Sequence, residues 1–384
     1  MPDEIDGFTQ SRHHFYNSMS KLHEVLWINP PRYFQNFKFK RNYLRSRSSG
    51  NIKVFNSLFP SDYAPHYNRG KPFFSTILKL YVICWRLLNT ILINRRISSY
   101  DVDEVILHIW RPQFDFAIDL VNHDKSIYHV DDNYAFSSHD EKRQLSSSEL
   151  RLLQNCDFSF IHSKTLFKEQ ANKSKNAFLL PNGVELSLYQ NQAPKFAINK
   201  ERFNKYDIIL GYVGAIKRHL NLPLLYDLAK NRKDLCIVLV GPIRENHKEI
   251  HGIIRKLQSL ENVFFDGMVN SESVPSYLFT FNIGLMPYKR NAYTKNIYPL
   301  KMHEYFAAGL PVISTDLENI IEFKESLYFA HTWSEYSSLI DEISSQSDHE
   351  RAKNKNNLMK IASANSWDNR VSRVIGILEQ NERV

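Results

Sequence analysis

Short apolar runs alternate with longer stretches of mixed apolar and polar residues along most of this chain. An alternation of strand and helix patterns is typical of a parallel sheet covered by helices. In the first half, the runs that predict strands are short and end at turn residues or at a helix; they lie at residues 24–28, 52–55, 105–109, 126–130 and 158–161. A helix is expected at residues 15–22. The pattern predicts an α/β fold.

The same alternation begins again after a polar stretch at residues 191–205, which reads as an interdomain linker. Further strands are expected at residues 208–213, 236–240, 263–265, 283–286 and 312–314, with a helix around 222–230. Ligands of open parallel sheets bind beyond the carboxyl ends of the strands. One rim of the second sheet should therefore carry Gly214, Gly241, Tyr288 and Lys301.

Length supports this division into two halves. A chain of 384 residues, 43% hydrophobic and 23% charged, is too long for one ordinary core. We expect a first domain over residues 1–195, a second over 206–365 and a last helix over 366–384. The amino-terminal residues are polar and hold no apolar segment of the kind that directs secretion, so a cytoplasmic location is expected.

A net charge of +8 is compatible with anionic lipid or with nucleic acid. Basic runs occur at residues 38–47 and 289–295, and the first interleaves aromatic residues with cations. No RNA-binding motif accompanies it, so we expect no nucleic-acid partner and a basic patch that is solvated or faces a membrane.

The apolar segment at residues 73–93 contains Lys79 and Arg86, which are costly at the centre of a bilayer. It predicts an amphipathic helix rather than a membrane span. A core helix of the first domain is the favoured reading, and a helix on a membrane surface is the alternative. The three cysteines match no metal-binding spacing and are expected to be buried thiols; they are Cys84, Cys156 and Cys236.

The segment at residues 291–315 carries the candidate ligand chemistry. Pro299 suits the first turn of a helix and Gly309 suits the left-handed residue that ends one, which predicts a helix of about three turns. Lys301 and Glu304 then share a face near the helix N-terminus, where phosphate is favoured. The lysine can meet a diphosphate and the carboxylate can accept ribose hydroxyls, although a surface ion pair is an equal alternative.

This segment resembles the donor-binding signature of GT-B glycosyltransferases of the family-4 type. The matching residues are Glu304, Ala307, Ala308, Gly309, Pro311 and Val312. Asn296 stands where the family usually has a second glutamate that contacts the donor sugar. The Pro-x-Lys-x-x-Glu-Tyr pattern at residues 299–305 is similar to a subgroup that includes a teichuronic acid transferase and, distantly, a glucuronosyltransferase, in which the lysine contacts phosphate.

Two further segments resemble the same family. Residues 179–186, LLPNGVEL, look like the segment that ends its first domain. Residues 211–216, GYVGAI, look like its glycine loop, in which Gly214 lets backbone amides approach phosphate, or else only makes a tight turn. Lys217 and Arg218 are candidate substitutes for the basic residues usual in that loop. With Tyr288, they complete the expected donor-binding residues.

The acceptor side needs a base if the anomeric centre inverts. Asp131 and Asp132 follow a predicted strand in a segment that resembles the Tyr-x-x-x-Asp-Asp pattern of the subgroup. Asp131 is the first candidate, with Asp132 and His129 as alternatives, and a turn-capping aspartate as the structural reading. No metal and no cofactor are expected, because Lys301 and a helix end would neutralise the diphosphate.

The resemblance implies two Rossmann-like domains that face each other across a cleft, with the last helix crossing back to the first domain. The first strand of the family is missing from this sequence. The implied activity is transfer of a sugar from a nucleoside-diphosphate sugar to a hydroxyl of a surface polysaccharide or lipid-linked glycan, with peripheral contact to an anionic membrane. A sugar-nucleotide epimerase and a non-catalytic sugar-nucleotide-binding partner remain alternatives.

Overall fold

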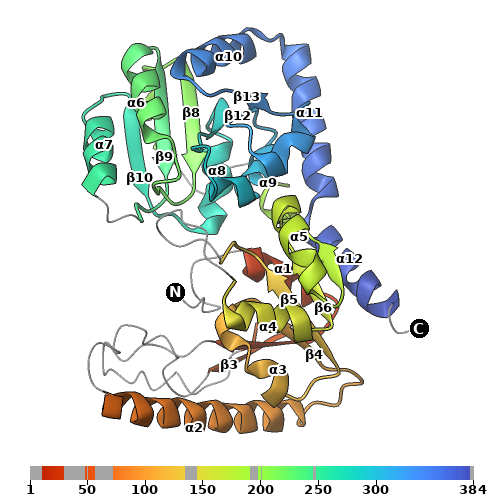
Figure 1. Ribbon diagram of the computed structural model, residues 1–384. Helices are drawn as coiled ribbons and strands as arrows, with labels where there is room; N and C mark the ends of the chain where they lie inside the picture. Colours follow the sequence, from red (N-terminus) through yellow and green to blue (C-terminus); the bar gives the residue numbers. More distant parts are fainter. Residues whose placement is uncertain are drawn as a thin grey trace. The chain divides into compact units, whose positions relative to one another are not determined.

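The computed structural model describes residues 11–29, 48–49, 51–56, 72–134, 145–190, 198–199, 201–244 and 248–380. The chain divides into two compact units, Met1–Leu180 and Pro181–Val384, which we call unit 1 and unit 2. Each unit has sheets and helices of its own (Figure 1). The basic run at 38–47 and the expected site of a first strand lie outside the described residues, as does most of the expected linker.

The described residues of unit 1 form two sheets. The larger has the order β4-β5-β6-β7 and is parallel throughout, whereas the smaller has the order β1-β3-β2, with β1 and β3 parallel and β2 antiparallel. The strands are β1 Val25–Asn29, β2 Ser48–Ser49, β3 Ile52–Asn56, β4 Ile106–Ile109, β5 Lys125–Val130, β6 Phe158–Ile161 and β7 Ala177–Leu179. The helices are α1 Ser11–Met19, α2 Pro72–Ile97, α3 Ala117–Leu120, α4 Ser147–Asn155 and α5 Lys164–Gln170.

Unit 2 contains one parallel sheet with the order β10-β9-β8-β11-β12-β13 in the described chain. Numbered within the unit, this order is 3-2-1-4-5-6, the order of the doubly wound dinucleotide-binding fold. The strands are β8 Ile208–Val213, β9 Leu235–Val240, β10 Val263–Gly267, β11 Ile283–Met286, β12 Val312–Ser314 and β13 Tyr328–Phe329. The chain reverses its direction of travel across the sheet between β8 and β11, which makes this the switch point where ligands bind.

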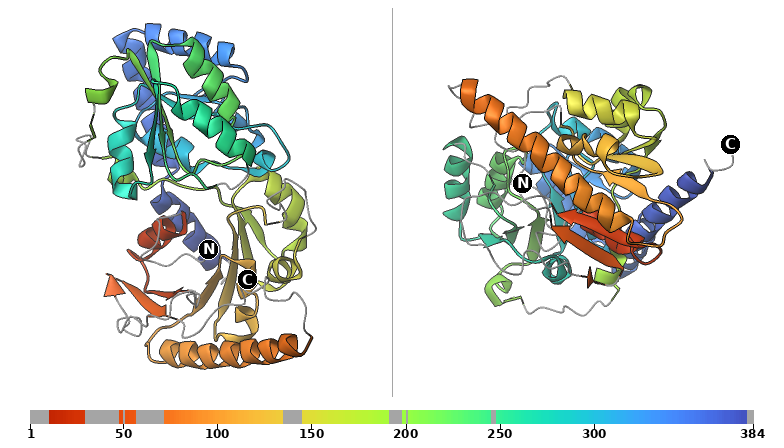
Figure 2. Two further views of the ribbon diagram at one scale, coloured as in Figure 1. Left: turned by 90° about the vertical axis from the view of Figure 1, so that its left-hand side faces the viewer. Right: turned by 90° about the horizontal axis from the view of Figure 1, so that it is seen from below.

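Helices lie on both sides of the unit 2 sheet (Figure 2). They are α6 Leu222–Asn231, α7 Lys248–Gln258, α8 Val274–Leu278, α9 Leu300–Ala307, α10 Trp333–Ser345 and α11 Asp348–Ala364. Helix α12 Trp367–Gln380 follows α11 and does not cover the sheet. Local sequence fixes where several begin: Thr332 with Glu335, and Ser347 with Glu350, form capping boxes at α10 and α11. Asn221 caps α6 by accepting the amide of Leu224.

The α/β class and the doubly wound parallel sheet predicted from the sequence are confirmed. Each expected strand is present, with ends that differ by at most two residues, but the short β2, β7 and β13 were not predicted. The first helix covers Ser11–Met19 rather than 15–22. Helix α9 has 8 residues, fewer than expected, and Gly309 follows it with φ of 68°. The domain bounds and the facing of the domains stay predictions.

Helix α2 is buried on one side only, so it is not the fully buried core helix of unit 1. It runs along one end of unit 1 beside α3 (Figure 1) and packs through Asn89, Thr90 and Ile93. Its cysteine, Cys84, is exposed, so the expectation of three buried thiols is wrong there and holds for Cys156 and Cys236. None of the helices in the described parts of the chain is both long and apolar enough to cross a membrane.

Two glycines meet where β8 and β9 end. Gly241 has a φ of 141°, and a Cβ atom added there would lie 2.1 Å from the carbonyl oxygen of Gly214. The amide of Gly214 in turn donates to the carbonyl of Val240 at 2.8 Å. The backbones of Gly214 and Gly241 therefore pack too closely for any side chain at Gly241.

We predict that Gly241→Ala destabilises the protein by roughly 2 kcal/mol or more, from left-handed backbone strain together with overpacking. The matched control is Gly252→Ala in α7, where an added Cβ meets nothing within 4 Å. That change should stabilise by about 0.5–1 kcal/mol, because alanine favours a helix. Midpoints of denaturant unfolding measure both, and equal midpoints for the two variants would contradict the packing argument.

Candidate functional site

The candidate ligand-binding rim of unit 2 lies at the carboxyl ends of β8 and β11. Gly214 follows β8 directly and has a φ of 143°, a conformation that favours glycine. A Cβ atom at Gly214 would lie 3.0 Å from Cε and 3.3 Å from Nζ of Lys301. Gly214 thus does more than make a turn: its missing side chain leaves room for the lysine, which brings two of the predicted residues together.

Lys301 occupies the first turn of α9 with its ammonium group among tyrosines. Its Nζ donates a hydrogen bond of 2.8 Å to the hydroxyl of Tyr288 and lies 5.2 Å from the ring centroid of Tyr212. Burial by itself lowers the pKa of this lysine, but the tyrosine oxygens around it outweigh burial and raise that pKa above its ordinary value. The group stays protonated at neutral pH.

Glu304 shares α9 with Lys301 but does not pair with it. Within the described chain, the Glu304 carboxylate forms neither an ion pair nor a hydrogen bond, and its residue is half-buried. Burial raises the pKa of Glu304, and the positive charge of Lys301 offsets part of that rise. Lys301 and Glu304 therefore do not form the surface ion pair that the sequence left as an alternative. Instead, an ammonium and a carboxylate are held apart, each with capacity for a ligand.

The loop between β8 and α6 adds Lys217, Arg218 and His219 to this rim. The amide of Lys289 donates to the carbonyl of His219 at 2.8 Å, which ties the loop to the segment after β11. Burial and, to a smaller extent, the charges of Lys301, Lys217, Arg218 and Lys289 lower the pKa of His219 to about 3. That four cations act on one imidazole shows that the predicted basic residues gather in one place.

Asn296 stands close to the same segment, in the short 3-10 turn Thr294–Asn296, and is 4% exposed. Its Nδ2 donates to the carbonyl of Ala292 at 3.2 Å, whereas its buried Oδ1 has no partner among the described residues. An unsatisfied buried acceptor is costly, which is consistent with a position kept for a ligand hydroxyl. The turn itself is fixed by Thr294, whose hydroxyl donates to the carbonyl of Lys289 at 2.6 Å.

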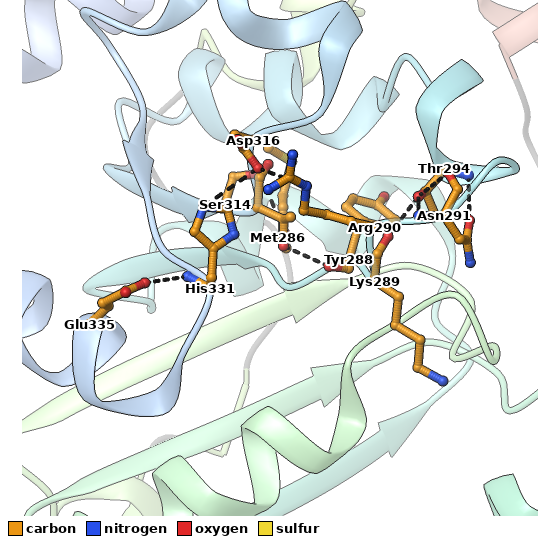
Figure 3. Close-up of polar contacts among 11 residues, drawn as sticks. Met286, Tyr288, Lys289, Arg290, Asn291, Thr294, Ser314, Asp316, His331 and Glu335 are labelled. Carbon is orange, nitrogen blue, oxygen red and sulfur yellow. Dashed lines mark hydrogen bonds and ion pairs between the residues drawn. The ribbon is translucent and has the colours of Figure 1, made fainter.

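A polar group that the sequence analysis missed lies just after β12 and β13 (Figure 3). Asp316 lies 3.5 Å from Nε of Arg290 and 3.6 Å from Nε2 of His331. The amide of His331 is held by Glu335, the residue that also caps α10. Arg290 is therefore neutralised within the protein, while its neighbour Lys289 extends to the opposite side in Figure 3.

In unit 1, the candidate base Asp131 directly follows β5 and has both oxygens engaged. Its Oδ2 lies 3.3 Å from Nη2 of Arg12, and its Oδ1 accepts a 2.5 Å hydrogen bond from the hydroxyl of Tyr134. The side chains of Arg12 and Asp131 are 8% and 11% exposed. Both oxygens of this carboxylate are therefore occupied by partners within the protein.

Asp132 differs from its neighbour. It is exposed, and one of its oxygens accepts the amide of Asn133 at 2.8 Å. His162, at the end of β6, was not predicted from the sequence; its Nδ1 is 2.9 Å from the carbonyl of Val130. Burial lowers the pKa of His162, and the carboxylate of Asp132 opposes that shift, so the two groups interact electrostatically.

His129 does not reach the surface. It is 2% exposed, and its ring stacks on Trp110 with centroids 3.7 Å apart and on His108 at 5.5 Å. Burial lowers the pKa of His129 well below its ordinary value. The ring belongs to an aromatic cluster that includes Phe15 of α1, and we see a packing role for it rather than a catalytic one.

Comparison with known proteins agrees with this geometry. Residues 195–358 match the family model described as Glycosyl transferases group 1. The chain is 29% identical over 235 residues to a Bacillus subtilis (strain 168) protein described as the teichuronic acid biosynthesis glycosyltransferase TuaH. That match covers 57% of this chain and 57% of the length of the relative.

Solved structures share the fold across almost the whole chain. Trehalose-6-phosphate synthase OtsA superposes with a TM-score of 0.70 at 14% identity, over 99% of this chain and 97% of its own. Sucrose-phosphate synthase of Thermosynechococcus elongatus gives 0.68 at 14% identity, over 97% and 92%. Anabaena HepE in complex with UDP gives 0.58 at 14% identity, over 86% of each chain.

The predicted GT-B fold is therefore confirmed, and residues 195–358 match the family model of group 1 glycosyl transferases.

Proposed function

We propose that this protein is a glycosyltransferase that takes a sugar from a nucleoside-diphosphate sugar bound to unit 2. The observation that carries the proposal is the pair of unmatched charges on α9, Lys301 and Glu304, at the switch point of a 3-2-1-4-5-6 sheet. Lys301 would meet the diphosphate, and Glu304 would accept ribose hydroxyls. The group 1 family match and the UDP complex of the structural neighbour HepE support a nucleotide-sugar donor.

In the transfer step, the acceptor oxygen forms a bond to the anomeric carbon while the bond from that carbon to the diphosphate oxygen breaks. The bonding electrons leave with the diphosphate, whose growing charge is stabilised by the ammonium of Lys301. Gly214 and Tyr288 hold that ammonium in place, so no reorganisation is needed as the charge develops. We propose that this arrangement acts without a metal or cofactor.

The proton lost by the acceptor hydroxyl needs a base if the anomeric centre inverts. We propose Asp132 for this task and a positioning role for Asp131. The two contacts of Asp131 with Arg12 and Tyr134 explain the choice, because they occupy both of its oxygens. Asp132 is exposed and keeps one oxygen free of hydrogen bonds within the described chain.

The proposed acceptor is a surface polysaccharide or lipid-linked glycan precursor, in line with the description of the Bacillus relative. An epimerase or a non-catalytic binding protein, the alternatives left open by the sequence, would bind the donor without transferring its sugar. A radiolabelled donor that labels no glycan or glycolipid, but is isomerised or retained unchanged, would favour one of these instead.

We further propose that α2 attaches the protein to the inner face of the cell membrane. Its outward side carries Ile83, Leu87 and Ile91, each four residues apart and 51%, 47% and 49% exposed. Leu88 is 43% exposed beside them. An apolar patch of this kind marks an interaction site, and its contiguity on one helix suits the boundary between headgroups and acyl chains.

Charge favours an anionic bilayer over a protein partner for this surface. The 26 residues of α2 include Lys79, Arg86, Arg95 and Arg96 but neither aspartate nor glutamate. Arg95 and Arg96 are exposed at the end of the apolar side. Cations next to an apolar helical face add electrostatic attraction to the insertion of its side chains.

We predict that Lys301→Met weakens binding of UDP or GDP by at least roughly tenfold, because a charge-assisted contact to phosphate is lost. Thermal shift and calorimetry measure the effect, since a ligand bound by the folded state raises the melting temperature. Lys295→Met is the matched control: Lys295 lies in the same segment but is exposed and 3.6 Å from Glu318. A Lys301→Met protein with unchanged affinity and turnover would contradict the phosphate role.

We predict that Asp132→Asn lowers kcat by roughly 10²–10⁴-fold and removes the loss of activity at low pH that protonation of this carboxylate causes. Asp131→Asn should mainly lower stability, because it removes the negative charge that lies 3.3 Å from Nη2 of Arg12. The exposed Asp103 gives a control, Asp103→Asn, with no effect on either quantity. If Asp131→Asn abolishes the pH limb and Asp132→Asn does not, the two roles are reversed.

We predict that Leu87→Ser combined with Ile91→Ser weakens binding to vesicles that contain phosphatidylglycerol by at least roughly tenfold. Binding of the wild type should weaken as salt is added, and it should be weaker on vesicles of pure phosphatidylcholine than on vesicles that contain phosphatidylglycerol. Leu22→Ser changes an exposed leucine elsewhere in unit 1 and should have no effect. Co-sedimentation with vesicles tests this. A concentration-dependent dimer that the double substitution dissolves, without vesicle binding, would instead make this face a self-association surface.

A further inference from the structure

His219 is a half-buried histidine on the loop between β8 and α6, next to Lys217 and Arg218. The sequence motifs did not identify it as a candidate site residue. Its ring stacks on Tyr288 with centroids 5.7 Å apart and lies 5.8 Å from the ring of Tyr293. Neither ring nitrogen has a hydrogen-bond partner among the described residues, although the backbone carbonyl accepts from Lys289. The imidazole is thus fixed in position with its polar atoms unused.

Cations approach this ring from three separate parts of unit 2. Lys217 and Arg218 come from its own loop, Lys289 from the segment after β11, and Lys301 from α9. Tyr288 links the ring to Lys301, because its ring stacks on His219 and its hydroxyl accepts the hydrogen bond from the Lys301 ammonium. In the described chain Lys217, Lys289 and Lys301 form no ion pair, whereas the neighbouring Arg290 is paired with Asp316 (Figure 3).

The like charges of Lys217, Lys289 and Lys301, which form no ion pair in the described chain, repel one another in the unliganded protein and attract an anion. An imidazole responds to a bound anion because its ordinary pKa, unlike that of a lysine, lies near neutral pH. With the cations unneutralised, the ring is neutral: burial and the surrounding charges hold its pKa near 3. A bound diphosphate supplies negative charge next to the ring and reverses the electrostatic part of that effect.

We propose that His219 is a proton-linked ligand of the donor diphosphate, neutral in the free protein and protonated when the diphosphate binds. This inference rests on the proposed function. The proton comes from solvent and stays on the imidazole, which then donates a hydrogen bond to a phosphate oxygen. In transfer, this donor stabilises the departing diphosphate together with Lys301, and no proton moves to the sugar.

The sign of the linkage follows from these two states. A group that is protonated only in the complex makes binding stronger as pH falls toward its pKa in the complex. Diphosphate affinity should therefore increase from alkaline to neutral pH in the wild-type protein. His219→Gln keeps a side chain of similar size with a hydrogen-bond donor but cannot titrate, so this dependence should disappear.

Calorimetry of UDP and GDP binding near pH 7.5, in two buffers with different ionisation enthalpies, measures the protons taken up. We expect net uptake by the wild type, its loss in His219→Gln, and a roughly tenfold weaker affinity in that variant, as for one charge-assisted hydrogen bond. His251→Gln, an exposed histidine on α7, is the matched control and should behave like the wild type.

The outcomes separate this inference from the proposed function. If UDP or GDP binds but the wild type and His219→Gln take up equal numbers of protons, His219 is not a proton-linked ligand and the donor-site proposal stands. If neither diphosphate binds the wild type, the donor-site proposal fails and this inference fails with it. Unchanged melting temperatures of the free variants show that any difference arises in the complex.

Discussion

The position of one ammonium group determines the chemistry of unit 2. Lys301 lies against Gly214, where any side chain would displace it, and donates to the hydroxyl of Tyr288. Both contacts depend on the strand order, because β8 and β11 are neighbours only in a sheet that is wound in two directions from its centre. The charge is therefore held at the switch point by backbone packing and a hydroxyl, and no carboxylate in the described parts of the chain forms an ion pair with it.

Much of the fold could be predicted because its strands are apolar runs with clear ends. β6, β11 and β12 match their predicted bounds, since turn residues or a helix follow each of them. The strands that were missed have 2 or 3 residues, too few for a periodic pattern to be seen. The packing of α2 was harder to predict. Its composition indicates a helix, but the side that packs depends on long-range contacts, such as the hydrogen bond from Asn94 to the carbonyl of Leu120.

The site was predictable where its members share one helix and was not where they meet through the fold. The spacing of Lys301 and Glu304 places them on one face, but whether they pair depends on side-chain directions that spacing leaves open. The contacts of Asp131 with Arg12 of α1, and the position of His219 among cations from three segments, arise only after folding. Local sequence carries no signal for either arrangement, apart from the basic residues at 217–218 and 289–290.

Helix α2 has one side that packs into unit 1 and another that we propose attaches the protein to a membrane. Its inward side packs polar Asn89 and Thr90, and the Thr90 hydroxyl is satisfied by the carbonyl of Arg86. About half of each outward side chain, Ile83, Leu87 and Ile91, remains exposed in folded unit 1. Their apolar area is available for transfer into lipid. The energy that holds the helix in the fold and the energy that binds a surface therefore reside on opposite faces, and each can change without the other.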